Sequence, residues 1–238
     1  YDVTTLGNHE FDYRARGLAE MLGAAVDSGD RLPAVVQANY KPPAGDGATR
    51  AAWENYGIGD YVVLERDGVR VAVFGLLGVD ADECAPMSGM EFTPLAQAAQ
   101  RVVETIQAQE AADYIVCLSH SGTTDGKGED YELAKAVDGI DVIISGHTHS
   151  ATQEPIRVND TLIVSCGEYT RNLGVLTVEK TGEGLDTLDF RLVPIDETVT
   201  EDAAMTAMAR RFQQKVDEGY LAGFGLSFDQ VLCESAFA

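Results

Sequence analysis

The sequence predicts an α/β fold, because apolar strands and amphipathic helices alternate from the N-terminus to the region of His149. The segment Tyr114–Leu118 is apolar throughout, as expected for a strand that helices cover on both faces. In addition, three strands each run out into a loop that carries histidine. Loops at the carboxyl ends of strands in an open α/β sheet form ligand sites, so we expect these histidines to share one site.

The composition is that of an ordinary globular protein with an unusual charge. The chain has 238 residues, of which 45% are hydrophobic and 24% are charged, and this length suffices for one large domain. Asp and Glu number 39 against 17 Lys and Arg, which gives a formal net charge of −22. This charge argues against nucleic acid and anionic lipid as partners. It would also repel a phosphate ester unless bound metal ions reversed the field, although the surface acid could simply serve solubility.

The four cysteines give no sign of a disulfide framework or of a cysteine-based zinc site. No CxxC pair is present, and Cys117 and Cys166 lie in apolar strand-like runs, where a reduced thiol is expected. The longest apolar run, residues 71–79, is far shorter than the ~20 residues that span a bilayer, so we expect no membrane span. The chain opens without an initiating Met or a signal peptide, and we interpret it as the middle of a longer protein.

Elements alternate in the first third of the chain. The apolar patterns predict a strand, a helix and a second strand at residues 3–6, 14–28 and 32–38. Residues 39–59 contain two consecutive prolines and several glycines, so we expect a long loop in which Trp53 packs against the core rather than stacking on a ligand. Two strands, 61–65 and 69–74, flank an Asp-Gly pair that is typical of a hairpin turn.

The alternation continues up to the last histidine loop and then changes. We expect a helix from Pro94 to about Ala112, a strand at 114–118, a short helix at 132–137 and a strand at 142–144. Beyond His149, strands without intervening helices predict an antiparallel sheet edge, at residues 161–165, 173–179 and 188–195. A polar helix is expected at 199–220, and a strand-like pattern resumes at 224–238.

All four histidines lie in three short motifs. These are Gly7-Asn8-His9-Glu10-Phe11-Asp12, Ser119-His120-Ser121-Gly122 and Gly146-His147-Thr148-His149. Asparagine oxygen and imidazole nitrogen can ligate a divalent metal ion, and Asp12 can orient the His9 ring. One such histidine alone would more often be structural, but three motifs that use every histidine indicate a phosphoester-cleaving metal site. In an extended loop His147 and His149 project to one side, so they can serve one ion or a pair ~3.5–4 Å apart.

These motifs resemble those of the bacterial 5′-nucleotidase family, within the calcineurin-like metallophosphoesterase superfamily. The resemblance rests on residues 5–12, 119–122 and 144–149, and more weakly on Leu173-Gly174 after Gly167, and it extends over nearly the whole chain. It implies a sandwich of two mixed sheets flanked by helices. It also implies a hydrolase that uses two divalent metal ions, such as zinc or manganese, to release phosphate from nucleoside monophosphates.

The resemblance further implies a role for each motif residue. Asn8, His120 and His147 would bind the second metal ion, and His149 would bind the first. Asn8 and His9 would contact the substrate phosphate. His9 would act catalytically on the leaving group, and Asp12 would hold its ring.

Two parts of the family pattern have no counterpart in this sequence. In the family an Asp-x-His strand and a Gly-Asp motif precede the Asn-His motif, and this chain begins after that point. We therefore expect a fold that lacks its first strands and, in this chain alone, a partial or empty metal site without activity. The expected domains are an N-terminally incomplete metallophosphoesterase domain at 1–198, a connecting helix at 199–222 and the start of a C-terminal substrate-binding domain at 223–238.

Other interpretations remain open at the level of the sequence. The enzyme could instead be a 2′,3′-cyclic nucleotide phosphodiesterase or a nucleotide-sugar hydrolase. A hypothesis of another class is a non-catalytic scaffold with an incomplete metal site. An uncovered sheet edge predicts association between copies of the chain. The family resemblance also implies an extracytoplasmic location, exported or at the cell surface.

Overall fold

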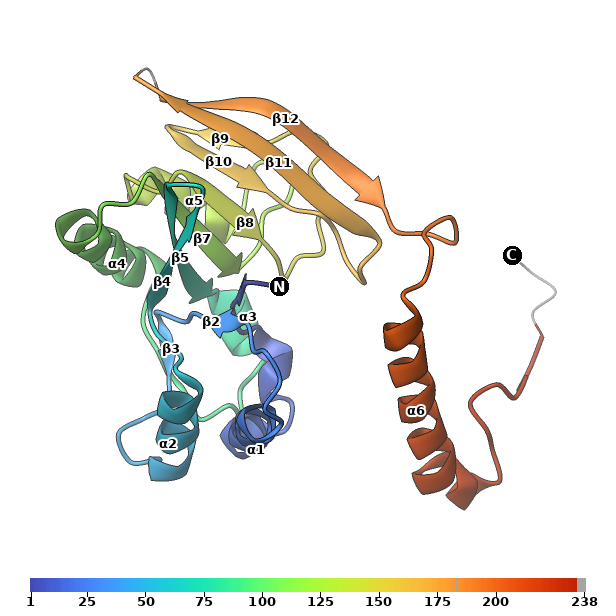
Figure 1. Cartoon of the computed structure of the whole chain (residues 1–238). Helices are drawn as coiled ribbons and strands as arrows, with labels where there is room; N and C mark the ends of the chain where they lie inside the picture. The colour runs from blue at the N-terminus through green and yellow to red at the C-terminus, as the bar shows by residue number, and fades with distance from the viewer. Residues whose placement is uncertain (183, 235–238) are drawn as a thin grey trace. The chain divides into compact units, whose positions relative to one another are not determined.

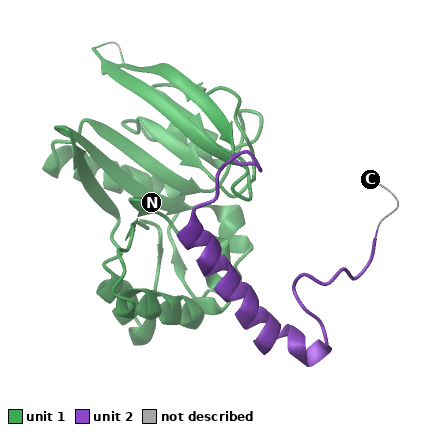
Figure 2. Cartoon of the chain, turned by 45° about the vertical axis from the view of Figure 1, so that its right-hand side comes forward, with its two compact units in different colours: residues 1–194 green, residues 195–238 purple. Residues whose placement is uncertain are grey.

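The computed structural model describes residues 1–182 and 184–234. Contacts within the chain divide it into two compact units, Tyr1–Pro194 and Ile195–Ala238, which are described separately (Figure 2). Unit 1 contains the three histidine motifs. The boundary between the units lies between Pro194 and Ile195, and the domain limits expected at 198 and 222 stay predictions.

Unit 1 alternates strands and helices along most of its length (Figure 1). Its strands are β1 (Val3–Thr4), β2 (Ala34–Val35), β3 (Tyr40–Lys41), β4 (Tyr61–Arg66), β5 (Val69–Leu77), β6 (Glu91–Phe92), β7 (Tyr114–His120), β8 (Val142–Ser145), β9 (Ile156–Val158), β10 (Thr161–Val164), β11 (Asn172–Thr181) and β12 (Gly184–Pro194). Its helices are the 3-10 helix η1 (Asn8–Phe11) and α1 (Arg14–Asp27), α2 (Gly47–Tyr56), α3 (Val79–Glu83), α4 (Leu95–Gln109) and α5 (Glu129–Ala136).

The largest sheet of unit 1 has the strand order β4-β5-β7-β8-β10-β9. The pairs β5–β7, β7–β8 and β8–β10 are parallel, whereas β4 and β9 pair antiparallel at the two edges. The sheet is therefore mixed, and the predicted α/β class is confirmed. Its register aligns Leu77 of β5 with His120 of β7, and Ser119 with Ser145 of β8. The loops after these three strands consequently start from one edge of the sheet.

Both faces of this sheet are covered by other elements. Successive residues of a strand point to opposite faces, so neighbouring residues pack in different cores. Ile143 of β8 is buried in the core that α4 and α5 form on one face. Its neighbour Val142 packs on the other face with Leu176 of β11 and Phe190 of β12. Figure 1 shows the antiparallel pair β11–β12 lying over the strands β8 to β10. Unit 1 thus has a helical layer, a central mixed sheet and a second, antiparallel sheet.

A second core surrounds α1 and α2. It contains Leu6, next to the Asn-His motif, and Phe11 from the motif itself, together with Leu18 and Leu22 of α1. Trp53 of α2 is buried in this core, which agrees with its predicted packing role. Burial of motif residues in the same core as two helices fixes the position of the first histidine loop.

The predicted loop at 39–59 is wrong, because this segment contains β3 and α2. α2 begins after Asp46, whose carboxylate accepts hydrogen bonds from the backbone nitrogen and hydroxyl of Thr49. It ends at Gly57, which has a φ of 86° and closes the helix in the left-handed conformation. The prolines precede the helix and the glycine ends it, so these residues delimit a helix rather than prevent one.

Other elements follow the predictions with changes in length. The helices α1, α4 and α5 and the hairpin β4–β5 are confirmed, and the hairpin turn has positive φ at Asp67 and Gly68. The first two predicted strands are shorter, and β1 and β2 pair in parallel as a small sheet of their own. β9 was not predicted, and the parallel pairing of β10 with β8 contradicts a purely antiparallel arrangement after His149. The β11–β12 pair is antiparallel as predicted.

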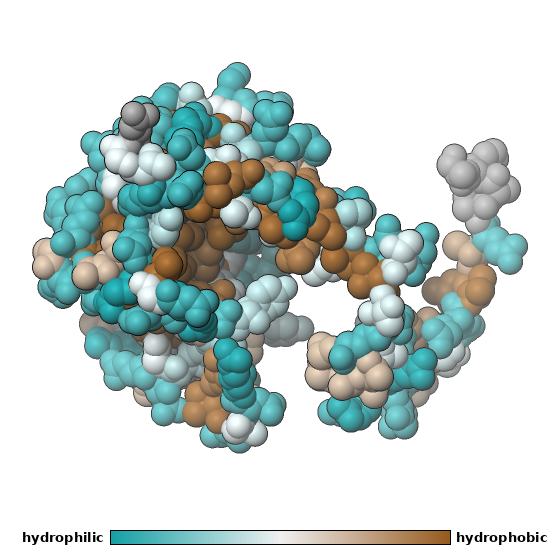
Figure 3. Space-filling model, turned by 45° about the horizontal axis from the view of Figure 1, so that its top comes forward, coloured by the Kyte–Doolittle hydropathy of each residue, from teal (hydrophilic) through white to brown (hydrophobic). Residues whose placement is uncertain are grey.

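Unit 2 consists mainly of α6 (Ala203–Gly219), followed by the 3-10 helix η2 (Leu221–Phe224). The Asp202 carboxylate caps α6 by accepting hydrogen bonds from the backbone nitrogens of Ala204 and Met205. The prediction of a strand at 224–238 is wrong for the described residues, because 225–234 form no strand. Residues 235–238 lie outside the described part. None of the helices among the described residues has the length and apolar character needed to cross a bilayer. Figure 3 shows hydrophilic residues over most of the visible outer surface of unit 1, with hydrophobic residues gathered in one area of it.

Candidate metal centre

The Asn-His motif forms the turn between β1 and α1. The Glu10 carboxylate accepts a hydrogen bond of 2.6 Å from the Gly7 nitrogen, which closes the start of η1. Asn8 is buried in this turn, whereas His9 is exposed. A Cβ atom at position 7 would lie 2.7 Å from the ring of His120, so glycine at this position lets that ring approach the turn.

Asn8 and His120 point at each other. The His120 Nε2–H group donates a hydrogen bond of 2.9 Å to Asn8 Oδ1, across 112 positions of sequence. Burial, reinforced by the charges of His147, His9 and His149, lowers the pKa of His120 from 6.5 to about 4. The imidazole is therefore neutral at physiological pH, and the neutral form is the one that ligates metal ions.

His147 lies beside His120 at the end of β8. The centroids of the two rings are 5.0 Å apart. The ring of His147 also contacts a carboxylate, with 2.7 Å between its Nε2 and Asp80 Oδ2. His147 has a φ of 74°, a left-handed conformation that residues other than glycine rarely adopt. Of the predicted ligands, the structure thus gathers Asn8, His120 and His147 at the carboxyl ends of the strands.

His149 has different neighbours. Its Nδ1 lies 2.8 Å from Glu168 Oε2, and its ring packs edge-on against the ring of Tyr169 with 5.5 Å between centroids. The structure does not bring His149 into hydrogen-bond contact with Asn8 or with His147 in the described part of the chain. It does lie close enough to contribute to the lowered pKa of His120.

His9 and Asp12 form a pair on the exposed side of the motif. The Nδ1 atom of His9 lies 3.1 Å from Asp12 Oδ2, and the two side chains are 80% and 59% exposed. If Nδ1 carries a proton, the carboxylate accepts it in a hydrogen bond and holds the ring. Nε2 is then the nitrogen that can face a substrate.

A buried carboxylate that sequence reasoning missed lies behind the histidine loops. Asp130 is fully buried and accepts hydrogen bonds from Ser145 Oγ at 2.5 Å and from the Gly122 nitrogen at 3.1 Å. Burial raises the pKa of Asp130 to about 6. The available signal was its spacing from Leu133 and Ala134, which places it on the buried face of α5.

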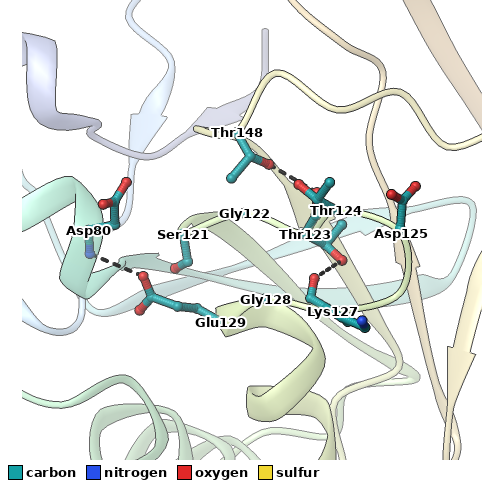
Figure 4. A pocket seen from close by; sticks show the side chains of 10 residues that line it. All are labelled: Asp80, Ser121, Gly122, Thr123, Thr124, Asp125, Lys127, Gly128, Glu129 and Thr148. Carbon is teal, nitrogen blue, oxygen red and sulfur yellow. Dashed lines mark hydrogen bonds between the residues drawn. The ribbon is translucent and has the colours of Figure 1, made fainter.

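An open pocket of about 500 Å³ adjoins the histidines. Its lining comes from the start of α3, the start of α5 and the loops after β7 and β8: Asp80, Ser121, Gly122, Thr123, Thr124, Asp125, Lys127, Gly128, Glu129 and Thr148. Figure 4 shows Asp80 at one end of this pocket and Asp125 with Lys127 at the other. The Thr148 hydroxyl donates to the Thr123 carbonyl at 3.0 Å, which joins the two histidine loops along the pocket wall.

Sequence reasoning also missed two side chains beside His147. Asp80 lies in α3, and Cys84 is the C-terminal cap of that helix. One carboxylate oxygen of Asp80, the sulfur of Cys84 and a ring nitrogen of His147 lie within 4.8 Å of one another. α3 is separated from every histidine motif along the chain, so only the folded structure brings these groups together.

The residues at the strand ends fit a divalent metal ion. Two ligand atoms bound to one ion at ~2.1 Å are separated by about 3.0–3.4 Å, and Asn8 Oδ1 and His120 Nε2 lie 2.9 Å apart. A bound ion would take the place of the hydrogen bond between these two atoms. Amide oxygen and imidazole nitrogen together suit ions such as zinc or manganese.

Comparisons with known proteins agree with this geometry. No protein-family model matches the sequence. The trifunctional nucleotide phosphoesterase protein YfkN of Bacillus subtilis is 32% identical over an alignment 247 residues long, which spans 92% of this chain and 16% of YfkN. The structure of a 5′-nucleotidase precursor from Thermus thermophilus superposes with a TM-score of 0.73 at 26% identity and covers 91% of this chain and 43% of that one.

The fold is also that of a solved calcineurin-like phosphoesterase, YfkN from Bacillus subtilis, with a TM-score of 0.65, 24% identity and coverage of 90% of this chain and 70% of that one. The chain spans well under half of the curated YfkN sequence and less than half of the Thermus protein. In sequence the chain is therefore a homologue of 5′-nucleotidases and related nucleotide phosphoesterases, and its fold is that of the calcineurin-like phosphoesterases.

Proposed function

We propose that this chain is the metal-binding part of a phosphoesterase that releases phosphate from nucleoside monophosphates. The observation that carries the proposal is the meeting of Asn8 with the neutral imidazole of His120, beside His147, at the ends of parallel strands. The similarity to nucleotide phosphoesterases over 92% of the chain supports the same reaction class.

Each motif residue receives a role in this proposal. Asn8, His120 and His147 hold one divalent ion, and His149 contributes to a second. When bound, the metal ions activate the attacking water and neutralise charge on the phosphate. His9 contacts the phosphate and, through Nε2, delivers a proton to the departing oxygen, while the Asp12 carboxylate stabilises the protonated ring.

The charge of the chain makes positive groups at the site necessary. With a formal net charge of −22, the chain repels a phosphate ester, and Lys127 is the one basic side chain among the residues that line the pocket. Metal ions at the histidines supply the local positive charge that attracts the substrate.

Several broader features belong to the same proposal. Residues 1–198 form the metallophosphoesterase domain, 199–222 a connecting helix and 223–238 the start of a substrate-binding domain. The protein acts outside the cytoplasm, with two metal ions, and copies of the chain associate through exposed sheet edges such as β4.

The test is phosphate release by the full-length protein encoded by the gene. The protein is loaded with zinc or manganese and assayed on AMP, with 2′,3′-cyclic AMP and a nucleotide sugar in parallel. Rapid release from AMP, which His120→Ala abolishes, is the expected result. Metal binding without hydrolysis of any of the three substrates would contradict the enzyme and support a non-catalytic scaffold.

A further inference from the structure

We propose that Asp80 is a positioning residue of the metal centre, whose carboxylate fixes which nitrogen of His147 binds the ion. The inference deepens the proposed function and rests on it in one respect, since it takes His147 as a ligand of the ion that Asn8 and His120 also hold. It introduces no further ion and takes no ligating nitrogen away from that centre. Nε2 of His147 is assigned to the hydrogen bond with Asp80, and Nδ1 to the metal ion.

The two nitrogens of the His147 ring have different tasks. A ring that ligates a metal ion is neutral, so one nitrogen carries the proton and the other binds the ion. The hydrogen bond made by the first nitrogen decides which one the second is. His147 Nε2 lies 2.7 Å from Asp80 Oδ2, within the range of a hydrogen bond to a charged group. An ionised carboxylate only accepts, so Nε2 carries the proton and Nδ1 keeps its lone pair.

The same contact selects one orientation of the His147 ring. The side chain of His147 is only 11% exposed, and its ring packs beside that of His120 with 5.0 Å between centroids. A half-turn of the ring would exchange Nε2 with a carbon atom, which cannot donate to the carboxylate in this way. The same half-turn would exchange Nδ1 with a carbon atom and remove the ligand. One hydrogen bond therefore holds both the proton and the orientation that metal binding needs.

The carboxylate of Asp80 is exposed, but the backbone that carries it is anchored. The Glu129 carboxylate accepts hydrogen bonds from the nitrogens of Val79 and Asp80, at 2.8 and 3.1 Å (Figure 4). The Gly78 nitrogen donates to the carbonyl of His120 at 3.0 Å. A Cβ atom at position 78 would lie 2.7 Å from the Cα atom of Ser121, so glycine lets the start of α3 lie against the loop after β7. Asp80 is thus held in a fixed relation to the strand that carries His120.

Charge gives the contact a further effect on metal affinity. Asn8, His120 and His147 are neutral ligands, so none of them balances the charge of a divalent ion. The carboxylate of Asp80 supplies negative charge one ring away from the ion and makes the imidazole a stronger donor. Loss of such a partner typically weakens metal binding by about 10–100-fold, and this is the effect we expect here.

The first measurement is the zinc affinity of the full-length protein, by competition with a chromophoric chelator. Asp80→Ala should weaken binding by about 10–100-fold. Asp80→Asn should weaken it less, because the amide oxygen still accepts a hydrogen bond. Glu83→Gln, which removes an exposed charge from the same helix, is the matched control and should leave the affinity unchanged.

The second measurement reads the hydrogen bond itself, without metal. Nitrogen and proton NMR of the metal-free chain at about pH 8, where an imidazole of ordinary pKa is neutral, shows which ring nitrogen carries the proton and how fast that proton exchanges with water. His147→Gln identifies the signals. We expect a slowly exchanging proton on Nε2 in the parent chain and in Glu83→Gln, and its rapid exchange in Asp80→Ala.

Two results would overturn the inference and leave the proposed function intact. One is a proton on Nδ1 of His147 in the parent chain, since Nε2 would then be the ligating nitrogen. The other is unchanged zinc affinity in Asp80→Ala while His120→Ala loses it. A full-length protein that binds no zinc or manganese would remove both proposals.

Discussion

The hydroxyl of Ser145 donates a hydrogen bond of 2.5 Å to the buried carboxylate of Asp130, which joins the end of β8 to the first turn of α5. The same carboxylate accepts a hydrogen bond from the nitrogen of Gly122, two residues after His120. One buried acid thus connects the loops that carry His120 and His147. The position of this acid explains why the two loops keep a fixed relation to each other.

Replacing Asp130 should change how stability depends on pH. The pKa of this carboxyl is raised from 3.8 to about 6, so the folded protein holds the proton more tightly than the unfolded chain does. The protonated Asp130 carboxyl therefore adds to the free energy of unfolding. This contribution is complete below the ordinary pKa of 3.8 and is lost as the pH rises through about 6. The loss amounts to about 3 kcal/mol, because a pKa shift of about two units corresponds to this free energy. Asp130→Asn removes this dependence.

The measurement is the free energy of unfolding in urea at several pH values between roughly 4 and 7. As the pH rises, the free energy of unfolding of the parent chain should fall relative to that of Asp130→Asn. Asp138→Asn, which changes an exposed carboxyl just beyond α5, is the matched control. A difference that stayed constant with pH would show that Asp130 does not titrate in this range.

His9→Ala in the full-length protein should lower kcat by about 10²–10⁴ while the metal content is retained, because the proposed function makes His9 a proton donor and not a metal ligand. Asp12→Asn should cost less, since it removes only the group that holds the ring. Elemental analysis together with kcat and KM for AMP separates this outcome from metal loss. Full turnover in His9→Ala would refute the role.

The His120 imidazole should stay neutral well below physiological pH in the metal-free chain. Burial and the neighbouring histidines lower its pKa to about 4, so protonation is expected only in strongly acidic buffer. Nitrogen chemical shifts of the ring, recorded by NMR across this range, give the midpoint, and His120→Gln identifies the signal. A midpoint near the ordinary value of 6.5 would mean that the ring is accessible to water.

Gly75→Ala should destabilise unit 1 by ~1–3 kcal/mol or more. A Cβ atom at this position of β5 would lie 2.1 Å from the carbonyl oxygen of Val36, which is backbone and cannot move aside cheaply. Gly23→Ala, in α1, has open space around its Cβ and should instead stabilise the chain by about 0.5–1 kcal/mol. Chemical denaturation of both variants checks the pair. Equal effects would mean that the close approach at Gly75 is relieved by local movement.

Periodic apolar patterns predicted the long elements because burial decides them. The helices α1 and α4 and the strand β7 each have a pattern that a single window of sequence reveals. α2 was missed because Pro42, Pro43 and the glycines around it are read as loop signals, although Asp46 and Gly57 are cap residues of a helix. β9 was missed because three residues form too short a pattern to recognise.

The residues of the site also fall into those that the sequence predicts and those that only the fold reveals. Asn8, His120 and His147 were predicted together because their motifs follow strands, and strands that run parallel end at one edge. Asp80, Cys84 and Asp130 belong to no motif, and their positions depend on how α3 and α5 pack. His149 has a motif position beside His147, yet its backbone φ of 58° and the acid at Glu168 give it other partners.

The parallel pairing of β8 with β10 has a consequence for synthesis on the ribosome. β8 carries His147, but one of its two neighbours, β10, is made only after the histidine loop and β9 have followed. Until then β8 is paired on one side only, with β7. The histidine loop therefore acquires its final support late in translation, and a nascent chain that stopped soon after the third motif would carry every predicted ligand on an incomplete sheet.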